Sequence, residues 1–135
     1  MPGTPMSTFD LAQKAMSAQL VRMNTAASNL ANAGSVASSE AAAYKPLKAV
    51  FATQLDAASG LATVRVAGVV QANTPAVRQH DPGHPLADAN GDIWAAPVDE
   101  NAEMVEMLDA SRQYQNLVEA VSTTKQLMLD TVRMK

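Results

Sequence analysis

Small and apolar residues recur with alternating steps of three and four along the first part of the chain. The positions that share this spacing are Phe9, Ala12, Met16, Gln19, Met23, Ala26 and Leu30. This is the period of an amphipathic helix and not of a strand. Ser7 or Thr8 can cap its start, and Asp10 suits the positive end of the helix dipole. The pattern predicts one helix over residues 8–31.

The last part of the chain repeats the same alternation over a longer stretch. Its positions are Met104, Met107, Ser111, Tyr114, Val118, Val121, Lys125, Met128 and Val132. Asp99 can serve as the N-cap, Glu100 and Glu103 suit the first turns, and Arg133 suits the end. We expect a helix of about nine turns at ~3.6 residues per turn.

Residues 34–98 follow a different pattern. A Ser/Ala-rich stretch over residues 34–43 has no periodicity and predicts a loop. Three short runs favour strands, at residues 47–53, 63–71 and 93–98. The pair Asn90-Gly91 favours a type I′ turn. The middle of the chain is therefore predicted to be a small β arm.

These patterns together predict a mainly α fold. We expect the long N- and C-terminal helices to pair as an antiparallel coiled coil, with a small β-hairpin-rich arm inserted between them. Residues 1–33 and 99–135 would form the coiled-coil domain, and residues 34–98 would form the inserted loop and arm. The methionines on the two helices are interpreted as packing residues and not as cofactor ligands.

Composition indicates a chain that buries its surface against copies or partners. Of the 135 residues, 26 are alanine, whereas Leu, Ile, Val and Phe together number only 27. With a net charge of −3, the chain lacks the excess of positive charge that is typical of nucleic-acid-binding proteins. The absence of cysteine excludes disulfides and thiol catalysis. No run approaches the ~18 apolar residues of a membrane span, and no secretory signal peptide is recognisable.

Charge is unevenly distributed along the chain. Residues 80–111 hold eight acidic residues and no basic one, whereas residues 11–80 carry a net charge of +4. This segregation suits head-to-tail packing of copies, in which an acidic surface meets a basic one. The alternative is that the acidic run is only a solvated turn and a helix start. The sequence leaves both interpretations open.

One short loop contains residue types that bind metals. His80, His84 and Asp88 could gather around zinc, although a tight turn with exposed histidines is the more ordinary interpretation. The acidic residues around Gly91 lack the spacing of a calcium loop. No phosphate-binding loop, nucleophile elbow or zinc-protease motif occurs. We therefore predict no catalytic residue, no cofactor, no metal and no enzymatic activity.

Several motifs resemble one family, the axial proteins of the bacterial flagellum. Residues 24–32, NTAASNLAN, are similar to its N-terminal Asn-x-Ala-Asn signature, and Tyr44-Lys45 to its aromatic–basic pair. The ten or so residues between them depart from the usual short link and resemble the small proximal-rod members. Residues 80–91, HDPGHPLADANG, are similar to the loop of those members, and residues 111–115, SRQYQ, to their C-terminal helix.

This resemblance implies a structural subunit of the proximal rod of the flagellar basal body. Such subunits assemble in the periplasm with copies of themselves and with other rod proteins, into a helical tube that transmits motor torque. The resemblance implies delivery by the flagellar type III export apparatus without a cleaved signal peptide, and neither nucleic-acid binding nor direct membrane insertion.

Two groups of residues are the candidates for the assembly site. The candidate interface residues on the helices are Met16, Met23, Asn29, Leu30, Asn32, Met104, Met107, Tyr114, Val118, Val121 and Met128. The candidate residues of the rod-type loop are Asp81, Pro82, Gly83, Pro85, Asp88 and Gly91. The alternatives are a coiled-coil adaptor, another flagellar axial protein of the rod or hook type, and a small His-ligated metalloenzyme.

Overall fold

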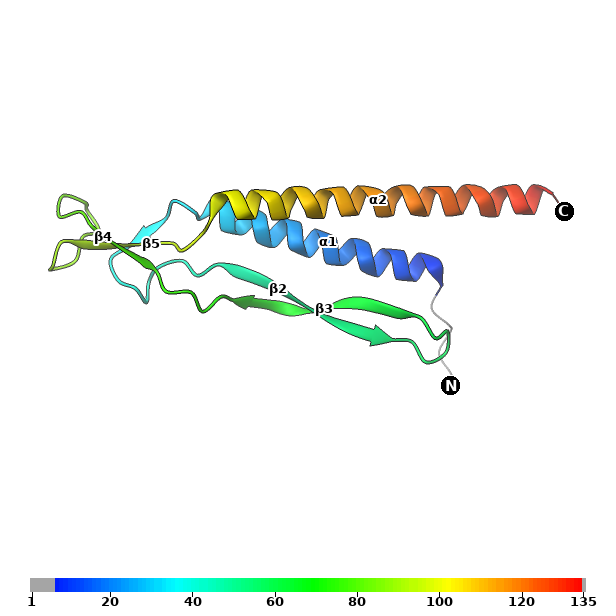
Figure 1. The fold of residues 1–135 in the computed structure, drawn as a ribbon, viewed down its shortest axis with the longest axis horizontal. Coiled ribbons are helices and arrows are strands. Elements are labelled where there is room, and N and C mark those ends of the chain that lie inside the picture. The colour runs from blue at the N-terminus through cyan, green and yellow to red at the C-terminus, as the bar shows by residue number, and fades with distance from the viewer. Residues whose placement is uncertain (1–6, 135) are drawn as a thin grey trace.

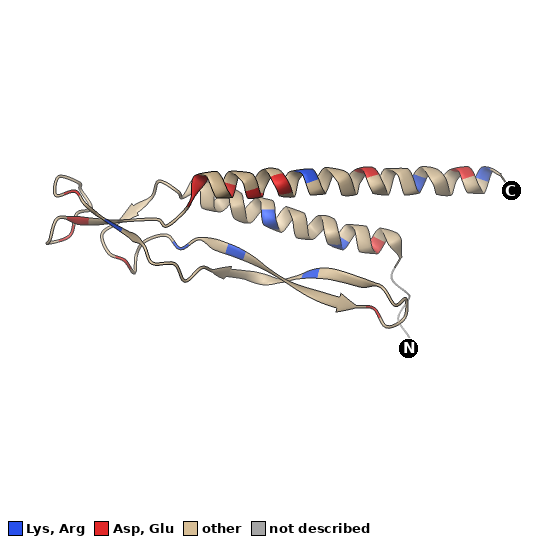
Figure 2. Cartoon of the chain, viewed as in Figure 1, with Lys and Arg blue, Asp and Glu red and all other residues tan. Residues whose placement is uncertain are grey.

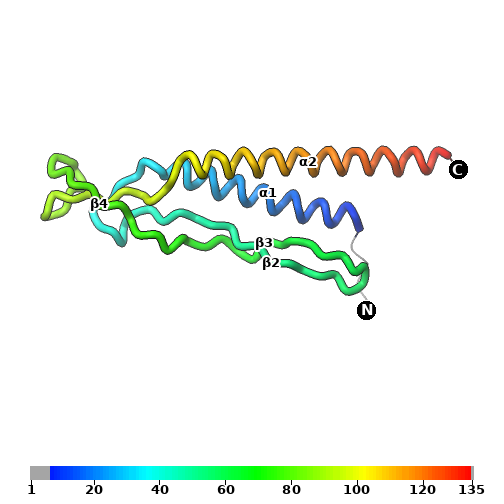
Figure 3. The backbone as a smooth tube through the Cα atoms, viewed as in Figure 1, coloured from blue at the N-terminus to red at the C-terminus, as the bar shows by residue number. Residues whose placement is uncertain are grey.

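The computed structural model describes residues 7–134 and contains a helix at each end (Figure 1). The elements are α1 Thr8–Ala31, β1 Val36–Ala37, β2 Leu47–Leu55, β3 Ala62–Gln71, β4 Val77–His80, β5 Asp92–Ala95 and α2 Glu100–Arg133. The molecule is elongated, and α1 runs antiparallel beside α2. The β2–β3 hairpin lies along the other side of α1, so that α1 is the middle layer (Figures 1 and 3).

The bounds of both helices follow from their caps. The Ser7 hydroxyl accepts from the Asp10 N–H at 3.1 Å, and the Asp10 carboxylate accepts from the Ser7 N–H at 3.0 Å. The hydrogen bond from the Ser7 N–H, together with one that the Ser7 hydroxyl donates to the same carboxylate at 2.9 Å, lowers the pKa of Asp10 below its ordinary value. The Asp99 carboxylate accepts from the Ala102 N–H at the start of α2. The predicted span of α1 and both predicted caps are confirmed.

The strands form two separate antiparallel sheets. In the hairpin, Leu47 of β2 pairs with Gln71 of β3, and Leu55 pairs with Ala62 near the turn. The second sheet has the order β1-β5-β4 and lies at the end where α1 stops and α2 begins. The three predicted strands are present with shifted bounds, whereas the short strands β1 and β4 were not predicted.

The predicted fold class is wrong. The strands are not a small arm, because the hairpin packs along α1 as a full layer. A coiled-coil seam between the helices is not established either, because their fully buried residues are small or polar and not large and apolar. The buried residues are Ala18, Thr25, Ala26 and Asn29 on α1 and Ala110 on α2. The division into two domains at residues 34 and 98 stays a prediction.

The turn at Asn90-Gly91 also differs from the predicted type I′. A type I′ turn needs positive φ at both central residues, but no described residue other than glycine has positive φ. Gly91 alone takes φ 76°, and its N–H donates to the Asp88 carbonyl at 3.0 Å. The turn is therefore centred on residues 89–90, with Gly91 following in the left-handed region.

Candidate assembly site

The motif residue Asn29 lies in the interior of the molecule, where three segments meet. Its side chain is 1% exposed. Its Oδ1 accepts from the Tyr44 hydroxyl and from the Leu47 N–H, each at 2.8 Å. Its Nδ2 donates to the Leu47 carbonyl and to Glu103 Oε1, each at 3.0 Å. The carboxamide therefore ties the end of α1 to the start of β2 and to the first turns of α2.

Arg22 makes a second polar tie between the helices. Its Nε donates to Glu106 at 2.7 Å, one terminal nitrogen donates to Asp109 at 2.9 Å, and the other donates to Gln19 at 2.7 Å. The hydrogen bond to Glu106 is the main reason why the pKa of the Arg22 guanidinium lies above its usual value. The guanidinium is mostly buried, whereas both carboxylates are about half exposed.

The two ties fix the register of the helix pair. Asn29 is level with Glu103, and Arg22 is level with Glu106 and Asp109. Continuing this antiparallel register places Thr8 level with about residue 123 of α2. The rest of α2, about ten residues and ~15 Å long, extends past α1. Figure 1 shows this extension, residues 124–133, which we call the overhang.

Helix α2 presents one covered and one uncovered face. The buried and half-buried positions on the covered face are Glu103, Glu106, Met107, Ala110, Ser111, Tyr114, Leu117, Val121 and Thr124. Four of the large apolar residues that α2 exposes are Met104 (50% exposed), Leu108 (63%), Val118 (45%) and Leu129 (44%); Val105, Leu127, Met128 and Val132 are exposed at other angles around the helix. The spacing of the first four places them within about a quarter turn of one another. We call them the uncovered stripe.

The predicted interface residues fall into three environments. Asn29 is buried within the chain. The half-buried ones are Met16, Met23, Leu30, Asn32, Met107, Tyr114 and Val121. The exposed ones are Met104, Val118 and Met128. The exposed group is the one that remains available to another molecule.

The rod-type loop connects β4 to β5 at the far end of the molecule (Figure 1). Asp88 Oδ1 accepts from the backbone N–H groups of Asn90 and Asp92, each at 2.9 Å. A Cβ on Gly91 would lie 3.1 Å from side-chain atoms of both His80 and Pro82. The loop therefore needs glycine at this position for its conformation and for space. Asp81, Pro82, Gly83 and Pro85 are exposed.

The two histidines of this loop are used in local contacts. His80 Nδ1 lies 3.0 Å from Asp92 Oδ1, and His84 Nδ1 accepts from the Leu86 N–H at 3.0 Å. Within residues 7–134, no three His, Cys, Asp or Glu side chains gather as metal ligands would. Neither helix in that range combines the length and apolar character of a membrane span.

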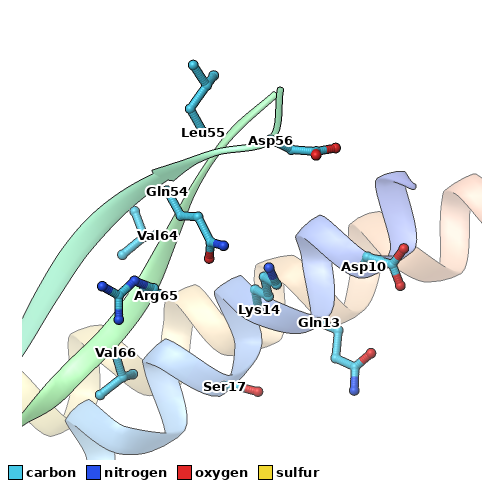
Figure 4. A pocket seen from close by; sticks show the side chains of 10 residues that line it. All are labelled: Asp10, Gln13, Lys14, Ser17, Gln54, Leu55, Asp56, Val64, Arg65 and Val66. Atoms are coloured by element: carbon cyan, nitrogen blue, oxygen red, sulfur yellow. The ribbon is translucent and has the colours of Figure 1, made fainter. Parts of the chain in front are cut away.

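A groove of about 690 Å³ separates the first half of α1 from the far part of the hairpin (Figure 4). Its lining residues are Asp10, Gln13, Lys14, Ser17, Gln54, Leu55, Asp56, Val64, Arg65 and Val66. Acidic, basic and apolar side chains are mixed along it. The groove is a surface feature of the layer contact between α1 and the hairpin.

Acidic residues gather at the start of α2, which Figure 2 shows in red. Part of this charge is neutralised within the chain, because Glu106 and Asp109 pair with Arg22. Asp99 and Glu100 remain exposed. Sequence reasoning missed the pairing of Arg22, although this lone arginine on an otherwise uncharged stretch of α1 is a signal for it.

Comparisons with known proteins match both ends of the chain. Residues 9–34 match the family described as Flagella basal body rod protein, and residues 90–134 match Flagellar basal body rod FlgEFG protein C-terminal. The flagellar basal-body rod protein FlgC of Salmonella typhimurium is 45% identical over 129 residues, which cover 94% of this chain and 95% of the relative. FlgC of Escherichia coli O157:H7 is 44% identical with the same coverage. FlgC of Agrobacterium fabrum is 29% identical over 90% of this chain and 88% of the relative.

Proposed function

The chain belongs to the FlgC family of flagellar basal-body rod proteins, and we propose on that premise that it is a structural subunit of the rod. The predicted resemblance is thereby confirmed. The subunit assembles with copies of itself and with other rod proteins. It works by packing and transmits torque through many contacts, without catalysis and without inserting into the membrane.

The observation that carries this proposal is the uncovered stripe of α2. Met104, Leu108 and Val118 are large apolar residues that residues 7–134 leave about half exposed. An exposed apolar face along a helix is typical of a surface that binds another protein. On burial, each such side chain stabilises the contact by about 1.5–3 kcal/mol at most.

Charge at the two ends of α2 supports a head-to-tail arrangement. The start of α2 exposes Asp99 and Glu100 beside Met104, whereas the overhang exposes Lys125, Asp130 and Arg133, a net charge of +1, beside apolar residues. An acidic, apolar start and a basic, apolar end are complementary. A head-to-tail contact that does not close into a ring produces a helical assembly. We propose that the overhang of one copy packs beside the start of α2 in the next.

Delivery to the rod is proposed from family membership. We infer that the flagellar export apparatus carries the chain to the periplasmic rod. The small buried core suits a chain that is transported unfolded, because only ten residues are buried within residues 7–134, and five of them are alanine.

The test is Val118→Asp in a motile bacterium that carries only this copy of the gene. Val118 is exposed in the free chain, so the variant keeps its helical circular dichroism and thermal midpoint. In the assembled rod the carboxylate would be buried without a partner, which is strongly unfavourable. The expected result is normal synthesis, no complete rods in electron micrographs of basal bodies, and no swimming.

Ala120→Asp is the matched control, because it places the same carboxylate two residues away, on the exposed side of α2 that lies opposite the uncovered stripe. It should leave rods and swimming unchanged. Complete rods in Val118→Asp cells would contradict the role of the uncovered stripe. Absence of the wild-type chain from purified basal bodies would contradict the proposed function as a whole.

A further inference from the structure

Two elements that do not touch each other bind the same buried carboxamide. Glu103, in the first turns of α2, accepts from Asn29 Nδ2 at 3.0 Å. Leu47, the first residue of β2, exchanges two hydrogen bonds with Asn29, one through its N–H and one through its carbonyl. Tyr44 adds a third bond from the hairpin side. Among these hydrogen bonds, only those of Asn29 connect Glu103 of α2 to Leu47 of β2.

The orientation of this carboxamide is determined by its partners. The Leu47 N–H can only donate and the Leu47 carbonyl can only accept, so Asn29 must present Oδ1 to the first and Nδ2 to the second. Both donors and both acceptor positions of Asn29 are then used. Because the side chain is fully buried, leaving one of these hydrogen bonds unmade is unfavourable.

We propose that Asn29 is a coupling residue that transmits the position of the first turns of α2 to the β2–β3 hairpin. When Glu103 moves away, Nδ2 loses its charged acceptor, and the carboxamide turns or opens toward solvent to recover one. This motion lengthens the bonds to Leu47 and loosens the first pair of the hairpin. A displacement of α2 therefore changes the hydrogen bonds of Leu47 in β2, although no hydrogen bond joins the two elements directly.

The coupling gives the uncovered stripe a second effect. Met104, its first residue, follows Glu103 directly and is half exposed. A neighbouring copy that packs on Met104 restricts the first turns of α2 and, through Asn29, tightens the hairpin. This last step rests on the proposed function, whereas the coupling itself is a property of the single chain.

Amide hydrogen exchange at Leu47 in the purified full chain tests the coupling. Glu103→Ala removes the charged acceptor and should raise the exchange rate of the Leu47 N–H by about tenfold or more. Glu103→Gln keeps an acceptor oxygen and should stay within about twofold of wild type. Glu106→Ala is the matched control one turn along the same face, because Glu106 pairs with Arg22 and not with Asn29; it should also change the rate by less than about twofold.

Three results would overturn the proposal. The first is a Leu47 amide that exchanges without protection in wild type. The second is a rate unchanged by Glu103→Ala, and the third is an equal rise in Glu106→Ala. In the Asn29→Ala background, Glu103→Ala should have no added effect. If Asn29→Ala does not fold, the contrast between alanine and glutamine at Glu103 still decides. These measurements need no assembled rod, so their failure is distinct from a failure of the proposed function.

Discussion

The two parts of α2 have the same apolar period but different surroundings. Residues 100–123 lie along α1, whereas the overhang extends beyond it. In the first part, Ala110 is fully buried and Glu103 and Glu106 bind α1. In the overhang, Leu127, Met128 and Val132 are more than half exposed. An apolar period therefore indicates that a helix face becomes buried. It does not indicate whether the same chain or another subunit buries it.

The contact within the chain also differs from the contact proposed between copies. Alanines and polar ties join α1 to α2, and such ties define one register. The uncovered stripe and the overhang instead present Leu, Met and Val. Methionine and leucine adapt to neighbours of different shape, which suits a subunit that packs against several partners.

The largest expected effect comes from removing the overhang. A chain that ends after residue 123 should fold as before, because the deleted residues extend past α1. It should build no rods, and the cells should not swim. Circular dichroism of the purified chain tests whether it folds, and electron microscopy of basal bodies tests whether rods are built. Normal rods from the shortened chain would contradict the role of the overhang.

A second prediction contrasts the same substitution on the two faces of α2. Ala110→Leu inserts three carbons into a fully buried site and should reduce the free energy of unfolding by about 1–3 kcal/mol. Ala120 is exposed, so Ala120→Leu should change it by less than about 0.5 kcal/mol. Urea denaturation of the free chains measures both. Equal effects would show that the covered face is assigned wrongly.

A third prediction concerns the polar tie at Arg22. Arg22→Met removes both ion pairs and should reduce the free energy of unfolding by about 1 kcal/mol, because the carboxylate partners are half exposed and screened by water. The difference from wild type should shrink in ~1 M salt. Arg112, exposed on α2, provides the control, and Arg112→Met should have a smaller effect that does not depend on salt in this way.

The smallest expected effect concerns the Asp10 cap at the start of α1. This end of α1 lies level with about residue 123 of α2, where the overhang begins. The pKa of Asp10 is lowered on folding, so its stabilising effect is present above the ordinary value of 3.8 and is lost as pH falls through the lower folded value. Acidification should therefore reduce the amide protection factor, which is the exchange rate of an unstructured chain at the same pH divided by the observed rate, in the first turn of α1. Asp10→Ala should abolish this pH dependence, and an unchanged dependence would contradict the capping box.

The helices could be predicted closely because their ends are chemically marked. Ser7 with Asp10 and Asp99 with the Ala102 N–H supply caps, and the period is uninterrupted between the ends of each helix. The strands β1 and β4 could not be predicted, because two and four residues are too few for an alternating pattern. The hairpin layer was missed because its packing on α1 depends on tertiary contact and not on local sequence.

The covered face of α2 was also not predictable from large apolar residues. The contact centres on Ala110 and on polar partners of α1, which hydrophobic periodicity does not emphasise. Asn29 could be recognised as part of a motif, but its burial and its four hydrogen bonds depend on residues 44, 47 and 103, which only the fold brings together.

The most direct test of the central claim compares labelling of one residue in the free and assembled states. The chain has no cysteine, so Val118→Cys introduces a single thiol on the uncovered stripe. A maleimide should label it readily in the purified chain and at least about tenfold more slowly in purified basal bodies, because a neighbouring subunit covers it. Ala120→Cys, on the exposed side of α2 opposite the uncovered stripe, should react readily in both states. Equal labelling of Val118→Cys in the free chain and in the basal body would contradict the claim that this face of α2 builds the rod.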